Sequence, residues 1–186
     1  MSPTGDYSVR KQERACGFSI LVHAEIEAFL EDRTREIFHK FCRDFNRDRK
    51  VSYSLSCFLC CYHSSWIEID ERHNSEIIAM AKNRGQANSV ADVIQKASIQ
   101  FSQIISNNHG VKEKNLRSLL IPIGVDFDSL DSIWIAEMES FGALRGERAH
   151  TSASVTRTIN PEDELYVVRR LLIGLQTLDE KINQLT

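Results

Sequence analysis

The scarcity of helix-breaking residues is the feature that most constrains how this chain can fold. Among its 186 residues there are only three prolines, Pro3, Pro122 and Pro161, and eight glycines. Proline and glycine are the residues that most often interrupt helices and form turns, so long uninterrupted helices are the expected outcome. We therefore predict an all-α fold of about five helices.

Apolar residues in the N-terminal half recur at three- and four-residue spacings, as in amphipathic helices. One such helix is predicted from about Val9 to Phe45. The run from Ser52 to Cys61 is too short for a decisive period, and we favour a helix continuing towards Met80 and Ala81 over a buried strand. A further helix is predicted from Val90 to Ile105, preceded by the capping pair Asn88 and Ser89.

The C-terminal half carries clearer boundary signals. A short helix is predicted from Glu113 to Leu120, ending before Pro122, and Asp128 or Ser129 is expected to cap the next helix. The last helix has Asn160 as its cap, Pro161 at its first position and three acidic residues in its first turn. Its apolar residues, Leu172 among them, are predicted to form a buried stripe. The hydroxyl-rich segment 151–159 before it is predicted to be a loop or short extended piece.

Length and composition are those of one globular domain. A chain of 186 residues with 42% hydrophobic residues can bury one core but is short for two, so we expect residues 1–8 to be a flexible N-terminus and 9–186 a single domain. With a net charge of −3, any contact with nucleic acid must come from a local patch. Because no signal peptide or membrane-length apolar run is evident, we expect a cytoplasmic protein.

The five cysteines predict reduced, buried thiols rather than a metal centre. Cys57 and Cys60 have the spacing of a CxxC pair, but a zinc site needs about four ligands and no second pair accompanies this one. Free cysteine usually behaves as a small buried hydrophobic residue. We predict that the chain uses neither a metal nor another cofactor.

The segment from Arg145 to His150 is the strongest candidate site. Arginine can grip a phosphate through two parallel hydrogen bonds, and histidine can transfer a proton near neutral pH. Together they supply what RNA cleavage without a metal requires, because the 2′-hydroxyl of RNA is an internal nucleophile. Positions five apart on a regular helix differ by about 140°, so either the helix ends or kinks there or a second chain completes the site. The competing explanation is a helix C-terminus whose cations complement the helix dipole.

His23 and Glu27 form a second candidate pair, four residues apart on the first predicted helix and close to its apolar stripe. Buried polar groups are usually just paired, so we favour an interhelical hydrogen bond over a direct role at the site. The isolated histidines His39, His63, His73 and His109 are expected to have surface or capping roles.

Three landmarks together resemble the RiboL-PSP branch of the HEPN superfamily. They are the segments 22–30, which contains His23 and Glu27, 108–112, with the sequence Asn-His-Gly-Val-Lys, and 145–151, in which four residues separate Arg145 from His150. The resemblance implies an α-helical bundle that forms a homodimer with the two Arg/His motifs facing each other. It also implies a metal-independent endoribonuclease that leaves a 2′,3′-cyclic phosphate and a 5′-hydroxyl.

By the same resemblance, Arg145 would hold the scissile phosphate and His150 would transfer the proton. Glu147, Arg148, Thr151, His23 and Glu27 would bind substrate or support the site. Such enzymes often serve as toxins or in antiphage and stress responses, which implies RNA as substrate and an antitoxin or defence-system protein as a further partner.

Gly146 departs from the family pattern and keeps two other hypotheses open. Many active members carry a polar residue directly after the arginine, a role that Glu147 or Arg148 could take over here. The first alternative is a catalytically inactive HEPN module that binds RNA or a protein partner. The second is a structural role in which the Arg/His cluster forms ion pairs at an interface.

Overall fold

The computed structural model describes residues 7–62, 90–150 and 160–185, with the backbone alone at 62 and 146–150. Within these ranges the chain forms six α-helices and no strand, which confirms the predicted all-α fold. The helices are α1 (Val9–Asp48), α2 (Tyr53–Tyr62), α4 (Val90–Ser106), α5 (Glu113–Ile123), α6 (Ser132–His150) and α7 (Pro161–Asn183), with a 3₁₀ turn η3 (Phe127–Ser129) before α6. The helical continuation towards Met80, the loop 151–159 and most of the N-terminal segment 1–8 lie outside the described residues.

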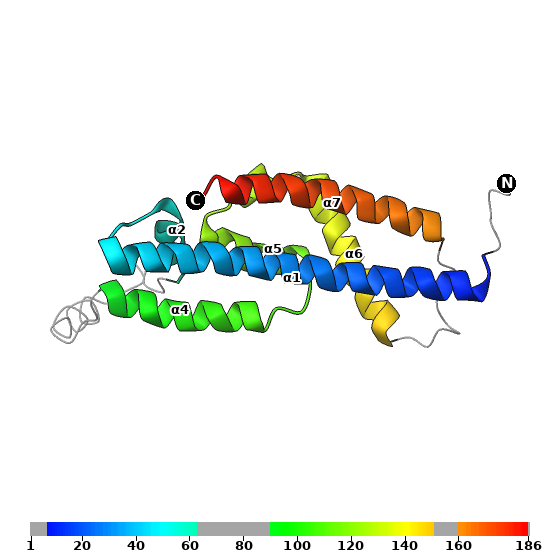
Figure 1. The fold of residues 1–186 in the computed structure, drawn as a ribbon, viewed down its shortest axis with the longest axis horizontal. Helices are drawn as coiled ribbons and strands as arrows, with labels where there is room; N and C mark the ends of the chain where they lie inside the picture. The colour runs from blue at the N-terminus through cyan, green and yellow to red at the C-terminus, as the bar shows by residue number, and fades with distance from the viewer. Residues whose placement is uncertain (1–6, 63–89, 151–159, 186) are drawn as a thin grey trace, which may run out of the picture.

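Helix α1 is the spine of the molecule. It packs against each of the other five described helices, and Figure 1 shows α7 and α4 running alongside it while α6 crosses it steeply. Its predicted apolar stripe is buried from Ile26 to Phe45, but Phe18 is 40% and Leu21 67% exposed. Both line an open groove between α1 and α7, together with Leu172 of α7, which is also exposed contrary to prediction.

The core is aromatic where α1 meets α2 and α4. Phe38 and Phe41 of α1 surround Phe58 of α2, with ring centroids 5.3 to 5.6 Å apart, and Phe101 of α4 closes the cluster. Edge-to-face pairs of this kind add about 0.5–1.5 kcal/mol beyond the burial of their area. The run from Ser52 to Cys61, whose apolar pattern was ambiguous, is helical as favoured. Its residues Leu55 and Phe58, three positions apart, both face this core.

Two predicted boundaries in the C-terminal half are wrong. Helix α5 continues through Pro122 and ends at Gly124, which takes the left-handed conformation at a φ of 100°. Because Pro122 lies in the last turn, its missing N–H removes one hydrogen bond and interrupts no further helix. Helix α6 is capped by Asp131, whose carboxylate accepts a hydrogen bond from the Ile133 amide at 2.9 Å, rather than by Asp128 or Ser129.

Helix α7 begins as predicted and packs against α1. The Asn160 side chain accepts a hydrogen bond from the Glu162 amide at 3.0 Å, and Pro161 opens the helix. Arg33 of α1 forms an ion pair with Asp179, with 2.7 Å between Nε and Oδ1. The C-terminal helix is thus fixed to α1 by a charged contact as well as by its apolar stripe.

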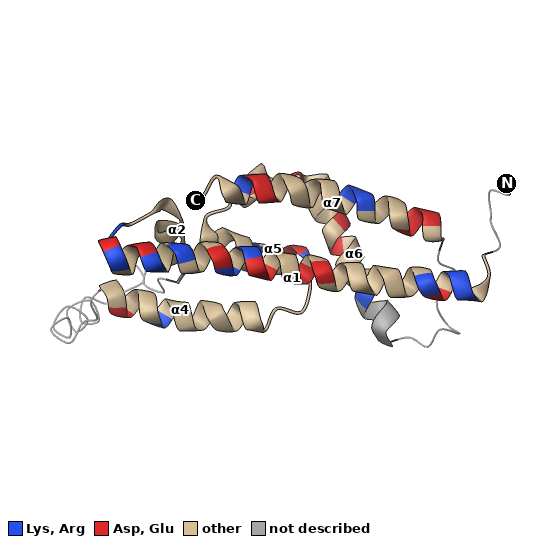
Figure 2. Cartoon of the chain, viewed as in Figure 1, with Lys and Arg blue, Asp and Glu red and all other residues tan. Residues whose placement is uncertain are grey.

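Charges of both signs are interspersed along the helices (Figure 2). The first turn of α7 carries three acidic residues, and burial together with the negative charge of one of them, Glu162, raises the pKa of Tyr7, which lies just before α1. Of the helices described, none is long and apolar enough to cross a membrane.

The contact between Trp134 and Gly174 yields a stability prediction. A methyl group at Gly174 would lie 2.1 Å from Cδ1 of Trp134, whose indole is buried against α7. We expect Gly174→Ala to lower the free energy of unfolding by about 1–3 kcal/mol in chemical denaturation, through overpacking. The matched control is Gly17→Ala, where a methyl group meets nothing within 4 Å. There the gain in helix propensity should raise the free energy of unfolding by about 0.5–1 kcal/mol, and equal effects at both positions would contradict the account.

Candidate functional site

Arg145 lies near the C-terminal end of α6 and its side chain is exposed. The helix runs to His150, so it does not end within the motif and the two positions are related by about 140° around its axis. Glu147 and Arg148 share this helical stretch. The side chains of these two residues and of His150, and the whole of Thr151, lie outside the described residues, and the roles predicted for them stay predictions.

His23 meets α6 through its ring. The side chain is buried, and its imidazole stacks on Phe141 with 5.9 Å between centroids and 27° between planes. Its polar contact is within its own helix, with 3.5 Å between Nδ1 of His23 and Oε2 of Glu27. Among the described side chains, His23 makes an interhelical ring contact and an intrahelical polar contact, and the expected interhelical hydrogen bond is not found there.

The positive charge of Arg145 influences the pKa values of both His23 and Glu27 on α1. Burial lowers the pKa of His23, and the positive charge of Arg145 lowers it further, so the imidazole is neutral at neutral pH. Burial and the neighbouring Glu31 raise the pKa of Glu27, while Arg145 and His109 act in the opposite direction. Phe141, on which His23 stacks, precedes Arg145 by four residues on α6, so the structure brings Arg145 to the side of α1 that carries His23 and Glu27.

His109 is the member of this cluster that sequence reasoning missed. It is exposed, as expected for a surface histidine, but it lies within electrostatic reach of Glu27. Its position in the segment 108–112, the second of the three landmarks that resemble the family, was the one feature of the sequence that pointed to it. An arginine, two histidines and a carboxylate at one place can bind a phosphate and can stabilise negative charge that develops on it.

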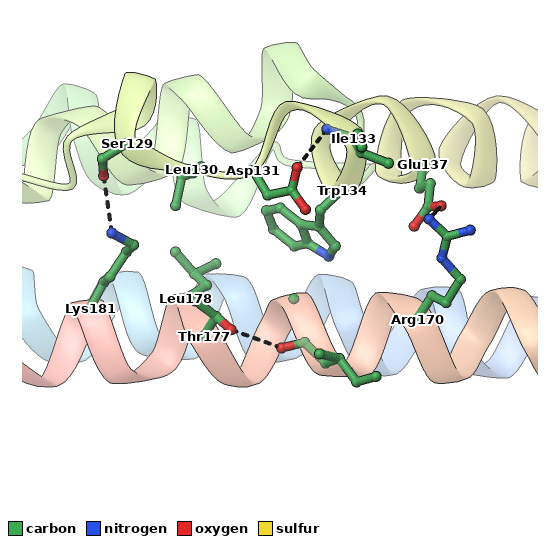
Figure 3. Close-up of a pocket in the computed structure, with 12 residues that line it drawn as sticks. Ser129, Leu130, Asp131, Ile133, Trp134, Glu137, Arg170, Thr177, Leu178 and Lys181 are labelled. Atoms are coloured by element: carbon green, nitrogen blue, oxygen red, sulfur yellow. Dashed lines mark hydrogen bonds and ion pairs between the residues drawn. The ribbon is translucent and has the colours of Figure 1, made fainter.

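A separate cavity of about 570 Å³ lies between the start of α6 and α7 (Figure 3). Trp134 lines it and donates a hydrogen bond from Nε1 to the Leu171 carbonyl at 3.2 Å. Lys181 donates to the Ser129 hydroxyl at 3.2 Å, and Arg170 forms an ion pair with Glu137. Of the predicted site residues whose side chains the structure describes, none lines this cavity.

The cysteines are free, as predicted, but they are not buried. Cys60 and Cys61 are exposed, and the other three are half-buried. On the short helix α2 the buried positions are taken by Ser54, Leu55 and Phe58. Among the described residues, no three or more His, Cys, Asp or Glu side chains form a group that could hold a metal ion.

The raised pKa of Glu27 predicts a pH-dependent stability difference. Folding disfavours its charged form, so Glu27→Gln should raise the melting temperature at pH 7. The gain should shrink as the pH falls through the raised pKa of Glu27 and vanish below the unfolded value of about 4.5, where the carboxyl is protonated in both states. The control is Glu25→Gln, an exposed position on the same helix, where we expect little change. A Glu27→Gln variant that is less stable than wild type at pH 7 would contradict this electrostatic account.

Comparison with known proteins gives one match, and it spans nearly the whole chain. The family model RiboL-PSP-HEPN matches residues 2–184. Searches of the curated proteins and of the solved structures found no match. The family match covers every element that builds the cluster, from α1 to the end of α7. The chain therefore belongs to the RiboL-PSP-HEPN family.

Proposed function

We propose that this protein is a metal-independent endoribonuclease. The observation that carries the proposal is the placement of an exposed arginine, Arg145, one helical turn after Phe141, whose ring stacks on buried His23 beside half-buried Glu27 of α1. HEPN domains are commonly ribonucleases, and the family match covers all of these residues. A carboxylate kept at an energetic cost beside an arginine is more typical of a functional site than of a core optimised for stability.

In the proposed reaction the 2′-oxygen of a ribose attacks the adjacent phosphorus, and the bond from phosphorus to the 5′-oxygen breaks. Arg145 binds the phosphate and stabilises the charge that accumulates on its oxygens. His150 transfers the proton that leaves the 2′-hydroxyl or reaches the departing 5′-oxygen. His23 and Glu27 act as positioning residues for Arg145, while Glu147, Arg148 and Thr151 bind or support the substrate.

The functional unit in this proposal is a homodimer in the cytoplasm. Because the α6 backbone is helical through positions 145 and 150, one copy presents the two positions in different directions. A second copy whose Arg/His motif faces that of the first would bring an arginine and a histidine together and complete the site. We place the enzyme in a toxin, antiphage or stress-response system, with a cognate antitoxin or defence protein as a further partner.

A second candidate function is a catalytically inactive module that binds RNA or a protein. Gly146 favours it, because that position has no side chain where many active relatives carry a polar one. Intact RNA bound with a steep dependence on salt would support this candidate, since phosphate contacts release counterions.

Cleavage of mixed RNAs in EDTA tests the first proposal. We expect wild-type protein to cleave and to leave cyclic phosphate ends. Arg145→Ala should reduce the rate by about 10²–10³-fold and His150→Ala by about 10²–10⁴-fold. Arg169→Ala on α7 and His39→Ala on α1 are matched exposed controls that should cleave like wild type. Absence of cleavage by wild type, or cleavage by the Arg145 and His150 variants at the wild-type rate, would refute the proposed ribonuclease activity.

The composite site makes a separate prediction about mixed dimers. When Arg145→Ala and His150→Ala chains carry different tags and are co-expressed, dimers selected on both tags should regain activity. Each such dimer holds one intact arginine and one intact histidine on different chains. If the mixed dimers stay as inactive as either parent while wild type cleaves, the two residues act within one chain.

A further inference from the structure

The loop between α4 and α5 is anchored at its start by a buried amide. Asn108 is 6% exposed, and its Nδ2 donates a hydrogen bond to Oε1 of Glu31 on α1 at 3.2 Å. Its Oδ1 accepts one from Nδ2 of Asn115 at 2.9 Å. Glu31 is held in turn by Arg35, at 2.8 Å. A buried amide satisfied on both sides fixes the backbone around it, because movement would leave a buried polar group without a hydrogen-bond partner.

The other end of the loop is fixed against α6, the helix that carries Arg145. Val111 is fully buried, and Gly142 lets α6 approach so closely that a methyl group there would lie 2.9 Å from Cγ and 3.3 Å from the backbone nitrogen of Lys112. The Glu139 carboxylate accepts a hydrogen bond from the Glu113 amide at 2.9 Å. The loop is thus fastened to the same helix within two turns of Arg145.

His109 is the exposed residue between these anchors. Its neighbours Asn108 and Gly110 are buried, so the two anchored ends present its side chain at the surface. Glu31, to which Asn108 is bonded, lies one helical turn after Glu27 on α1, and Glu27 is within electrostatic reach of both His109 and Arg145. A carboxylate shared by an imidazole and a guanidinium on a rigid frame can orient both groups towards one anion.

We propose that His109 is a third RNA-contacting residue, which donates a hydrogen bond to a phosphate oxygen of the strand held by Arg145, with Glu27 as the positioning residue for both. The inference rests on the proposed function and extends it with a contact from a third segment. It involves binding only, and no bond to phosphorus forms or breaks at His109.

Binding of a short single-stranded RNA that is 2′-O-methylated at every nucleotide tests the inference, because such RNA cannot be cleaved by its own 2′-oxygen. We expect His109→Ala to weaken the affinity about tenfold, as for loss of one charge-assisted hydrogen bond, without lowering the melting temperature. His39→Ala, which removes another exposed histidine, should bind like wild type. If His109→Ala does lower the melting temperature, His109→Gln serves as the second variant and should show the same loss of affinity.

Two further comparisons separate a positioned contact from a merely structural one. The effects of His109→Ala and Glu27→Gln on affinity should be non-additive, since one group orients the other. Asn108→Ala should weaken RNA binding, whereas Asn107→Ala, an exposed neighbour, should not. If wild type binds the RNA and His109→Ala binds it equally well, the inference is overturned and the proposed function stands. If wild type binds no RNA, the proposed function fails and the inference fails with it.

Discussion

The packing of every other described helix onto α1 is the constraint on which the rest of the structure depends. At 40 residues the helix is about 60 Å long, so its apolar stripe can serve as a common surface for helices distant in sequence. Most of that stripe is aliphatic and aromatic. At the turn from His23 to Glu27, however, the face turned towards α6 is polar. The candidate site lies at this interruption of the core, where α6 and the loop before α5 meet the spine.

The polar residues of the site lower the stability of the folded chain, which separates the site from ordinary core packing. An uncharged side chain in place of Glu27 would avoid both the burial of a carboxylate and the repulsion from Glu31. His23 must remain neutral beside a guanidinium. Asn108 places a buried amide, hydrogen-bonded to Asn115, where an apolar side chain would pack. These choices oppose stability and favour a fixed arrangement of charge, as binding sites for anions require.

Local signals predicted most of the fold. Asn160 and Pro161 marked the start of α7 correctly because a cap and its helix are neighbours in sequence. The cap of α6 was misplaced because Asp128, Ser129 and Asp131 are all suitable residues, and only the backbone path decides among them. The exposure of Phe18 and Leu172 was missed because periodicity identifies an apolar face without showing whether another helix covers it.

The candidate site could be predicted only where a motif is contiguous. The spacing of Arg145 and His150 and that of His23 and Glu27 are visible in the sequence, and the family resemblance linked the two segments. The place of His109 beside Glu27 depends on the Asn108 anchor and on the close approach of α6 at Gly142, which are contacts between distant segments. No local pattern encodes such contacts, so an exposed histidine in a loop gave no sign of its neighbours.

The central claim is that RNA binds where α1, the loop before α5 and the end of α6 converge. Mapping of NMR chemical shifts on the labelled full chain during titration with the 2′-O-methylated RNA tests it most directly. The account predicts perturbations concentrated at residues 23–27, 108–112 and from 141 onward. Perturbations confined to the cavity between α6 and α7, or none at saturating RNA, would contradict it.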